Sequence, residues 1–90
     1  MTTFKIRDDA LDWIEAGDEI IALDRRSASY LSANSSAALL WRRLVAGATR
    51  RGLVEELVNT FDIDEERAVA DVKAFLAQLE GAGLLATAGP

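Results

Sequence analysis

The chain contains neither cysteine nor histidine. It therefore has no disulfide, no thiolate nucleophile, no imidazole base and none of the usual zinc ligands. Its carboxylates also lack the spacing of a calcium loop, which requires a central glycine and a closing glutamate. The sequence predicts no catalytic residue, no metal site and no cofactor.

A long hydrophobic run is missing as well. The first ten residues read MTTFKIRDDA, which lacks the apolar stretch of a signal peptide. No later segment reaches the roughly 20 apolar residues that a membrane-spanning helix needs. We expect a cytoplasmic protein that does not bind membranes.

The length and charge limit the fold and its partners. Of the 90 residues 50% are hydrophobic, which is enough for one compact domain. We expect this domain over residues 1–85, followed by a flexible tail over residues 86–90. The formal net charge of -5 disfavours nucleic acid as a partner, because affinity for phosphates comes mainly from lysine and arginine.

The first third of the chain has the pattern of short strands. Apolar or alternating runs predict strands over residues 4–6, 11–14, 19–23 and 29–32. The polar segments 16–18 and 24–27 have the length of hairpin connections, so the last three strands should form an antiparallel meander. Ile20, Ile21 and Leu23 predict a central strand that is buried against helices, whereas residues 29–32 predict an edge strand.

The remainder has helical periodicity. Helices are predicted from Asn34 to Gly47, from a Thr49 cap onward, and from an Asp64 cap to about Gly81. The expected buried positions are Leu40, Trp41, Leu44 and Val45, then Leu53, Leu57 and Phe61, then Ala68, Val72, Phe75 and Leu79. This order predicts an α+β, winged helix-turn-helix-like domain, with a three-stranded antiparallel sheet followed by three helices.

A winged-helix arrangement often binds DNA through its third helix, but this helix is acidic. It contains Asp64, Glu65, Glu66, Asp71 and Glu80 against only Arg67 and Lys73. Such a helix would be repelled by the phosphates that flank a major groove. The sequence therefore argues against binding of nucleic acid.

With this order of elements, the chain closely resembles the PqqD-like family from Trp13 to Leu85. The family comprises small recognition domains for ribosomally synthesised, post-translationally modified peptides. The resemblance is carried by EIIALD at 19–24, YLSAN at 30–34, Trp41 with Leu44 and Gly47, Leu53 and Leu57, FDI at 61–63, Asp71 and Val72 with Phe75 and Leu79, and GLL at 83–85. Residues 3–9 lie outside it and suit an added strand, a tail or a contact with a partner enzyme.

The resemblance implies a non-catalytic domain that binds the leader segment of a precursor peptide. The leader adds as an antiparallel strand to an open sheet edge, where backbone groups supply affinity and pockets select alternate side chains. The second partner is then a separate modification enzyme, such as a leader protease, a cyclase or a radical enzyme. Both a lasso-peptide recognition protein and a pyrroloquinoline-quinone-type chaperone fit the resemblance.

The resemblance also assigns candidate binding residues. The edge strand that receives the peptide is Ser29, Tyr30, Leu31 and Ser32, and the third helix supplies a groove wall from Ala68, Val69, Val72 and Phe75. Arg25 and Arg26 at the preceding hairpin, and Arg67 or Lys73 on the helix, are candidates to pair with acids of the leader. One departure is that Ser27 or Ala28 stands where the family usually has a turn glycine.

Several residues have a structural interpretation beside the functional one. Trp41 should be core, and Asp24 and Asn34 should satisfy turn and cap amides. Tyr30 is equally suited to contact the ligand or to pack under the first helix. A different function also remains, a winged-helix module for protein interaction or transcriptional support, and an open edge strand allows a homodimer.

Overall fold

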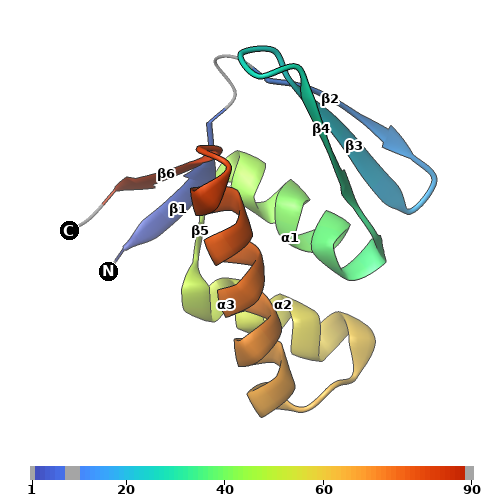
Figure 1. Ribbon diagram of the computed structural model, residues 1–90. Helices are drawn as coiled ribbons and strands as arrows, with labels where there is room; N and C mark the ends of the chain where they lie inside the picture. The colour runs from blue at the N-terminus through green and yellow to red at the C-terminus, as the bar shows by residue number, and fades with distance from the viewer. Residues whose placement is uncertain (1, 8–10, 89–90) are drawn as a thin grey trace.

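The computed structural model describes residues 2–7 and 11–88 and has the expected α+β composition with three helices (Figure 1). The strands are β1 Thr3–Ile6, β2 Leu11–Ala16, β3 Glu19–Asp24, β4 Ser29–Ala33, β5 Ala48–Thr49 and β6 Leu85–Ala88. The helices are α1 Ser35–Ala46, α2 Arg50–Phe61 and α3 Glu65–Gly81. The predicted meander is confirmed, because β2, β3 and β4 form a three-stranded antiparallel sheet in that order.

The meander packs against α1 with one face only, whereas α2 and α3 lie on the other side of α1 (Figure 1). Since side chains alternate along a strand, β3 buries Ile20, Ala22 and Asp24 and leaves Ile21 36% exposed. The expectation that Ile20, Ile21 and Leu23 are all buried against helices is therefore wrong. No helix covers the outer face of β3 within the part of the chain that the structure describes.

A second sheet joins the two ends of the described chain. Its strand order is β5-β1-β6, and β1 pairs with β6 along its whole length, from Thr3 opposite Ala88 to Ile6 opposite Leu85. The prediction of a flexible tail from residue 86 is thus wrong for residues 86–88; residues 89–90 lie outside the described part. Pairing with β1 satisfies the backbone groups on one side of β6, which gives this segment a reason to be ordered.

The helix starts follow the predicted capping chemistry in two of three cases. Thr49 Oγ1 accepts the N–H of Gly52 at 3.0 Å, and Asp64 Oδ1 accepts the N–H of Arg67 at 2.8 Å. Asn34 occupies the N-cap position of α1, but its side chain makes no capping bond and instead accepts a hydrogen bond from Ser36 Oγ at 3.4 Å.

Trp41 belongs to the core, as predicted. Trp41 is fully buried on α1, and its ring meets that of Trp13 from β2 edge to face, with centroids 6.0 Å apart at an angle of 69°. The other fully buried large side chains are Ile20, Leu40, Leu44, Leu53, Leu57, Val72 and Leu79. Phe61 was expected among them but is 38% exposed, because it is the last residue of α2 before the left-handed Asp62.

Replacing Trp41 by alanine should remove its ring contact with Trp13, which is one of the contacts that join the meander to the helices. We expect Trp41→Ala to lower the free energy of unfolding by about 3–5 kcal/mol, the usual cost of a large aromatic cavity. Phe61→Ala is the matched control and should cost less than about 1 kcal/mol, since its ring is partly in solvent already. Urea denaturation followed by tryptophan fluorescence and circular dichroism measures both, and equal losses would contradict the assignment of Trp41 to the core.

Candidate functional site

Strand β4 lies at the edge of the meander, as the sequence predicted. It pairs with β3 on one side, and no strand among the described residues pairs with its other side. Its unpaired N–H and C=O groups are a template for an additional extended chain. Leu31 is half-buried on the inner face, whereas Tyr30 points outward and is 75% exposed. The edge thus presents one side chain to the core and the next to solvent.

A hollow of about 180 Å³ opens beside β4 on the inner face of the meander. Its walls come from the meander and from the turn that follows α3, through Leu11, Ala22, Asp24, Ser27, Ser29, Tyr30, Leu31, Ala82 and Leu84. A strand added to β4 would point every second side chain toward this inner face. The hollow can therefore receive one or two small or medium apolar side chains of such a strand.

Asp24 is the buried carboxylate in this wall, with 9% of its surface exposed. Its Oδ1 accepts the backbone N–H of Arg26 at 3.0 Å and the Nε–H of the same residue at 3.4 Å. The bond from the backbone N–H is the main reason why the pKa of Asp24 lies below its usual 3.8. Partial burial acts in the opposite direction, and the Arg26 guanidinium and Ser27 add to the lowering. Asp24 therefore closes the β3–β4 turn, as expected.

The two arginines at this turn lie near β4, as predicted, but both bind the protein itself. Arg25 Nη1 pairs with Asp12 Oδ1 on β2 at 3.3 Å. Arg26 Nη2 donates to the carbonyl of Gly83 at 3.3 Å, which joins the β3–β4 turn to the turn after α3. Arg26 thus holds the two walls of the hollow together, a role that the sequence did not reveal.

The residues predicted on α3 do not line the hollow beside β4. Ala68 and Val72 are fully buried and Phe75 is 7% exposed, so all three belong to the hydrophobic core. Val69 is 44% exposed but lines a different hollow with Val54 of α2. Their contact with a peptide stays a prediction, and Ala82 and Leu84 take the place beside β4.

The two charged candidates on α3 are on its solvent side. Arg67 pairs with Asp71 one turn later, with Nε and Oδ2 3.8 Å apart, and Lys73 is exposed. An exposed pair of this kind contributes little to stability. Both side chains can turn toward a bound acid, so their role also stays a prediction.

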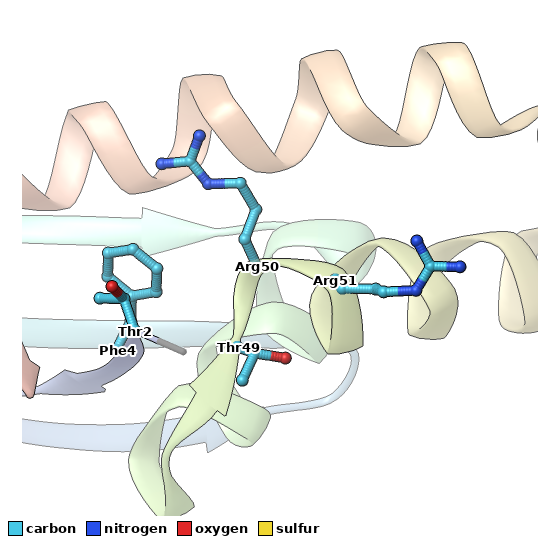
Figure 2. A pocket seen from close by; sticks show the side chains of 5 residues that line it. All are labelled: Thr2, Phe4, Thr49, Arg50 and Arg51. Atoms are coloured by element: carbon cyan, nitrogen blue, oxygen red, sulfur yellow. The ribbon is translucent and has the colours of Figure 1, made fainter. Parts of the chain in front are cut away.

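A separate hollow between β1 and the start of α2 gathers two arginines without forming a convergent site. Figure 2 shows Arg50 reaching over Phe4, whereas Arg51 extends away along α2. The Arg50 guanidinium lies 5.7 Å from the centre of the Phe4 ring, a cation–π contact, and Arg51 Nε pairs with Glu55 at 3.4 Å. These contacts account for both arginines structurally.

The described residues contain neither a candidate metal site nor a candidate membrane-spanning helix. Over residues 2–7 and 11–88, no group of three or more His, Cys, Asp or Glu side chains is arranged to hold a metal ion. Within the same residues, no helix has the length and hydrophobicity required to span a bilayer. The open edge of β4 and its hollow are the features on which a function can be built.

The chain is similar to known proteins in sequence and in structure. Residues 19–85 match the family model described as coenzyme PQQ synthesis protein D (PqqD). TbiB1 in complex with the TbiA(beta) leader peptide has a similar structure, with a TM-score of 0.83, 23% identity and coverage of 90% of this chain and 93% of that one. A lasso peptide synthetase B1 complexed with the leader peptide has a TM-score of 0.81, 24% identity and coverage of 92% and 96%. No curated protein sequence matches this chain.

The lowered pKa of Asp24 predicts how stability depends on pH. A carboxyl whose pKa is lower in the folded state stabilises the fold above its unfolded value, here 3.8, and loses that effect as the pH falls through the folded value. Wild type should therefore be more stable than Asp24→Asn at pH 7, and the difference should shrink as the pH falls below 3.8. Urea denaturation of both proteins at a series of pH values measures this difference in stability. A difference that stays constant with pH would contradict the role of the Asp24 carboxylate in the turn.

The backbone conformation of Ala28 predicts that glycine at this position would stabilise the β3–β4 turn. Its φ of 54° lies in the left-handed region, which costs energy for a residue with a Cβ. We expect Ala28→Gly to raise the free energy of unfolding by about 0.5–1 kcal/mol. The control Ala70→Gly, in the middle of α3, should lower it by about 1 kcal/mol. Thermal unfolding of wild type, Ala28→Gly and Ala70→Gly measures these changes. A loss of stability in Ala28→Gly would show that the turn is not strained.

Proposed function

Because this chain belongs to the PqqD family, we propose that its β4 strand binds the leader segment of a ribosomally synthesised precursor peptide. The leader adds as a strand and is thereby delivered to a separate modification enzyme, such as a leader protease, a cyclase or a radical enzyme. The observation that carries the proposal is the open edge of β4 beside an apolar hollow. The two similar structures contain leader peptides, which supports it further.

The physical basis is the pairing of extended backbones. An edge strand satisfies the N–H and C=O groups of any extended peptide, and the hollow selects the side chains that face it. A disordered leader loses conformational entropy when it binds, so its affinity is moderate and it can be released. These properties suit a protein that captures a substrate for another enzyme.

The proposed role is non-catalytic. Asp24 is the carboxylate in the wall of the hollow, and its Oδ1 accepts two hydrogen bonds from Arg26, so this carboxylate already serves the turn. The chain has no cysteine or histidine that could take these roles. We propose that the protein works in the cytoplasm, where precursor peptides are translated.

Proline scanning of β4 tests strand addition. Consecutive N–H groups along a strand point to opposite edges, so one of Leu31→Pro and Ser32→Pro removes an N–H that faces the open edge and the other removes a bond to β3. We expect the variant that keeps its Tm to lose at least tenfold in affinity for the leader. The loss follows because proline removes an N–H from the new ladder.

The measurement is fluorescence anisotropy with a labelled leader from the precursor encoded nearby. A scrambled leader of the same composition is the control and should bind weakly, because the hollow selects side chains at alternate positions. Wild-type affinity in both proline variants would overturn strand addition at β4. Absence of leader binding by folded wild type would overturn the proposed function.

A further inference from the structure

The outer face of the meander carries an apolar patch that nothing in the described chain covers. The patch consists of Ile14, Ile21, Leu23 and Tyr30, and it spans all three strands. Ile14 lies opposite Ile21, and Leu23 lies opposite Tyr30, so the four residues are cross-strand neighbours. With Asp12 and Trp13 they line a shallow depression of about 440 Å³.

This exposure exceeds what a solvated sheet face requires. Ile14 is 62% exposed, Ile21 36% and Tyr30 75%. They make up three of the five large hydrophobic residues that are exposed among those described, and the other two, Phe61 and Val69, are on the helices. Antiparallel sheets with one solvated face normally alternate hydrophobic and polar residues. A contiguous apolar patch instead indicates an interaction surface.

The charges around the patch favour a foreign partner with basic residues. At one end Asp12 is paired with Arg25 at 3.3 Å. At the other end Glu19 lies on the same face of β3 as Ile21, and Asp18 stands beside it in the β2–β3 turn. A lysine or arginine of a partner can therefore be placed at this acidic end.

A second copy of this chain is a poor occupant. Each strand is about five residues long, at about 3.3 Å per residue, and the three strands are spaced about 4.8 Å apart. The outer face of the meander therefore measures only about 240 Å². A stable interface needs about 800 Å² from each partner. Two copies, each with a net charge of -5, would also repel each other. The patch suits an anchor within a larger or transient contact with a different protein.

We infer that the outer face of the meander docks the modification enzyme, through an apolar projection of that enzyme flanked by lysine or arginine. The inference rests on the proposed function for the identity of the partner, but it uses a different surface. The peptide occupies the edge of β4 and the inner hollow, whereas the enzyme occupies the opposite face of the same sheet. One sheet can then hold substrate and enzyme at once.

The test uses the full chain and the purified modification enzyme encoded beside it. We expect Ile14→Lys to weaken association with the enzyme at least tenfold and to change leader affinity less than twofold. Phe61→Lys is the matched control, because it places the same charge on an exposed hydrophobic residue away from the sheet, and it should leave both values unchanged. Glu19→Lys should weaken association several-fold at low salt and reduce its dependence on ionic strength.

Biolayer interferometry measures association with the enzyme, and leader anisotropy is measured on the same samples. Unchanged association in Ile14→Lys, or no association of wild type at micromolar concentration, overturns the inference. Sedimentation velocity tests whether a second copy of the chain covers the patch. A wild-type dimer that becomes monomeric in Ile14→Lys would identify a second copy as the occupant and would also overturn the inference. Absence of leader binding by wild type would instead count against the proposed function. A failure of the docking inference is therefore distinguishable from a failure of the proposed function.

Discussion

The attachment of the meander to α1 by one face is the constraint on which the remaining features depend. Trp41 supplies the centre of this attachment, since it is fully buried and stacks edge to face on Trp13 of β2. Because the strands alternate their side chains, burying Ile20 and Ala22 on the inner face forces Ile21 to the outer one. The packing of one face on α1 thus determines which side chains of the meander are available to a partner.

A second constraint positions the inner hollow. The hollow is bounded by residues that are far apart in sequence, from Leu11 in β2 to Leu84 after α3. Arg26 bridges the two sides, with Asp24 on one hand and the carbonyl of Gly83 on the other. The hydrogen bond from the backbone N–H of Arg26 also holds the pKa of Asp24 below its usual value. The β3–β4 turn is therefore joined to the turn after α3 across the hollow beside β4.

Local signals predicted the fold well, and tertiary relations account for the failures. Periodicity and capping residues such as Thr49 and Asp64 located the helices, because these effects act within a few residues. The pairing of β1 with β6 joins opposite ends of the chain and has no local signal. In the site, the edge strand was predictable from its polarity, whereas the role of Arg26 toward Gly83 depends on a contact across 57 positions.

The same sheet can serve two partners because its surfaces are chemically separate. Its inner face is apolar and packs on α1, its free edge offers backbone groups, and its outer face offers Ile14 and Tyr30. Backbone pairing at the edge depends little on side-chain chemistry, whereas docking on the outer face depends on it directly. Substitutions on the outer face can therefore change the enzyme that is served without changing how the peptide is held. In the proposed role, this separation allows a small domain to connect a peptide to its enzyme.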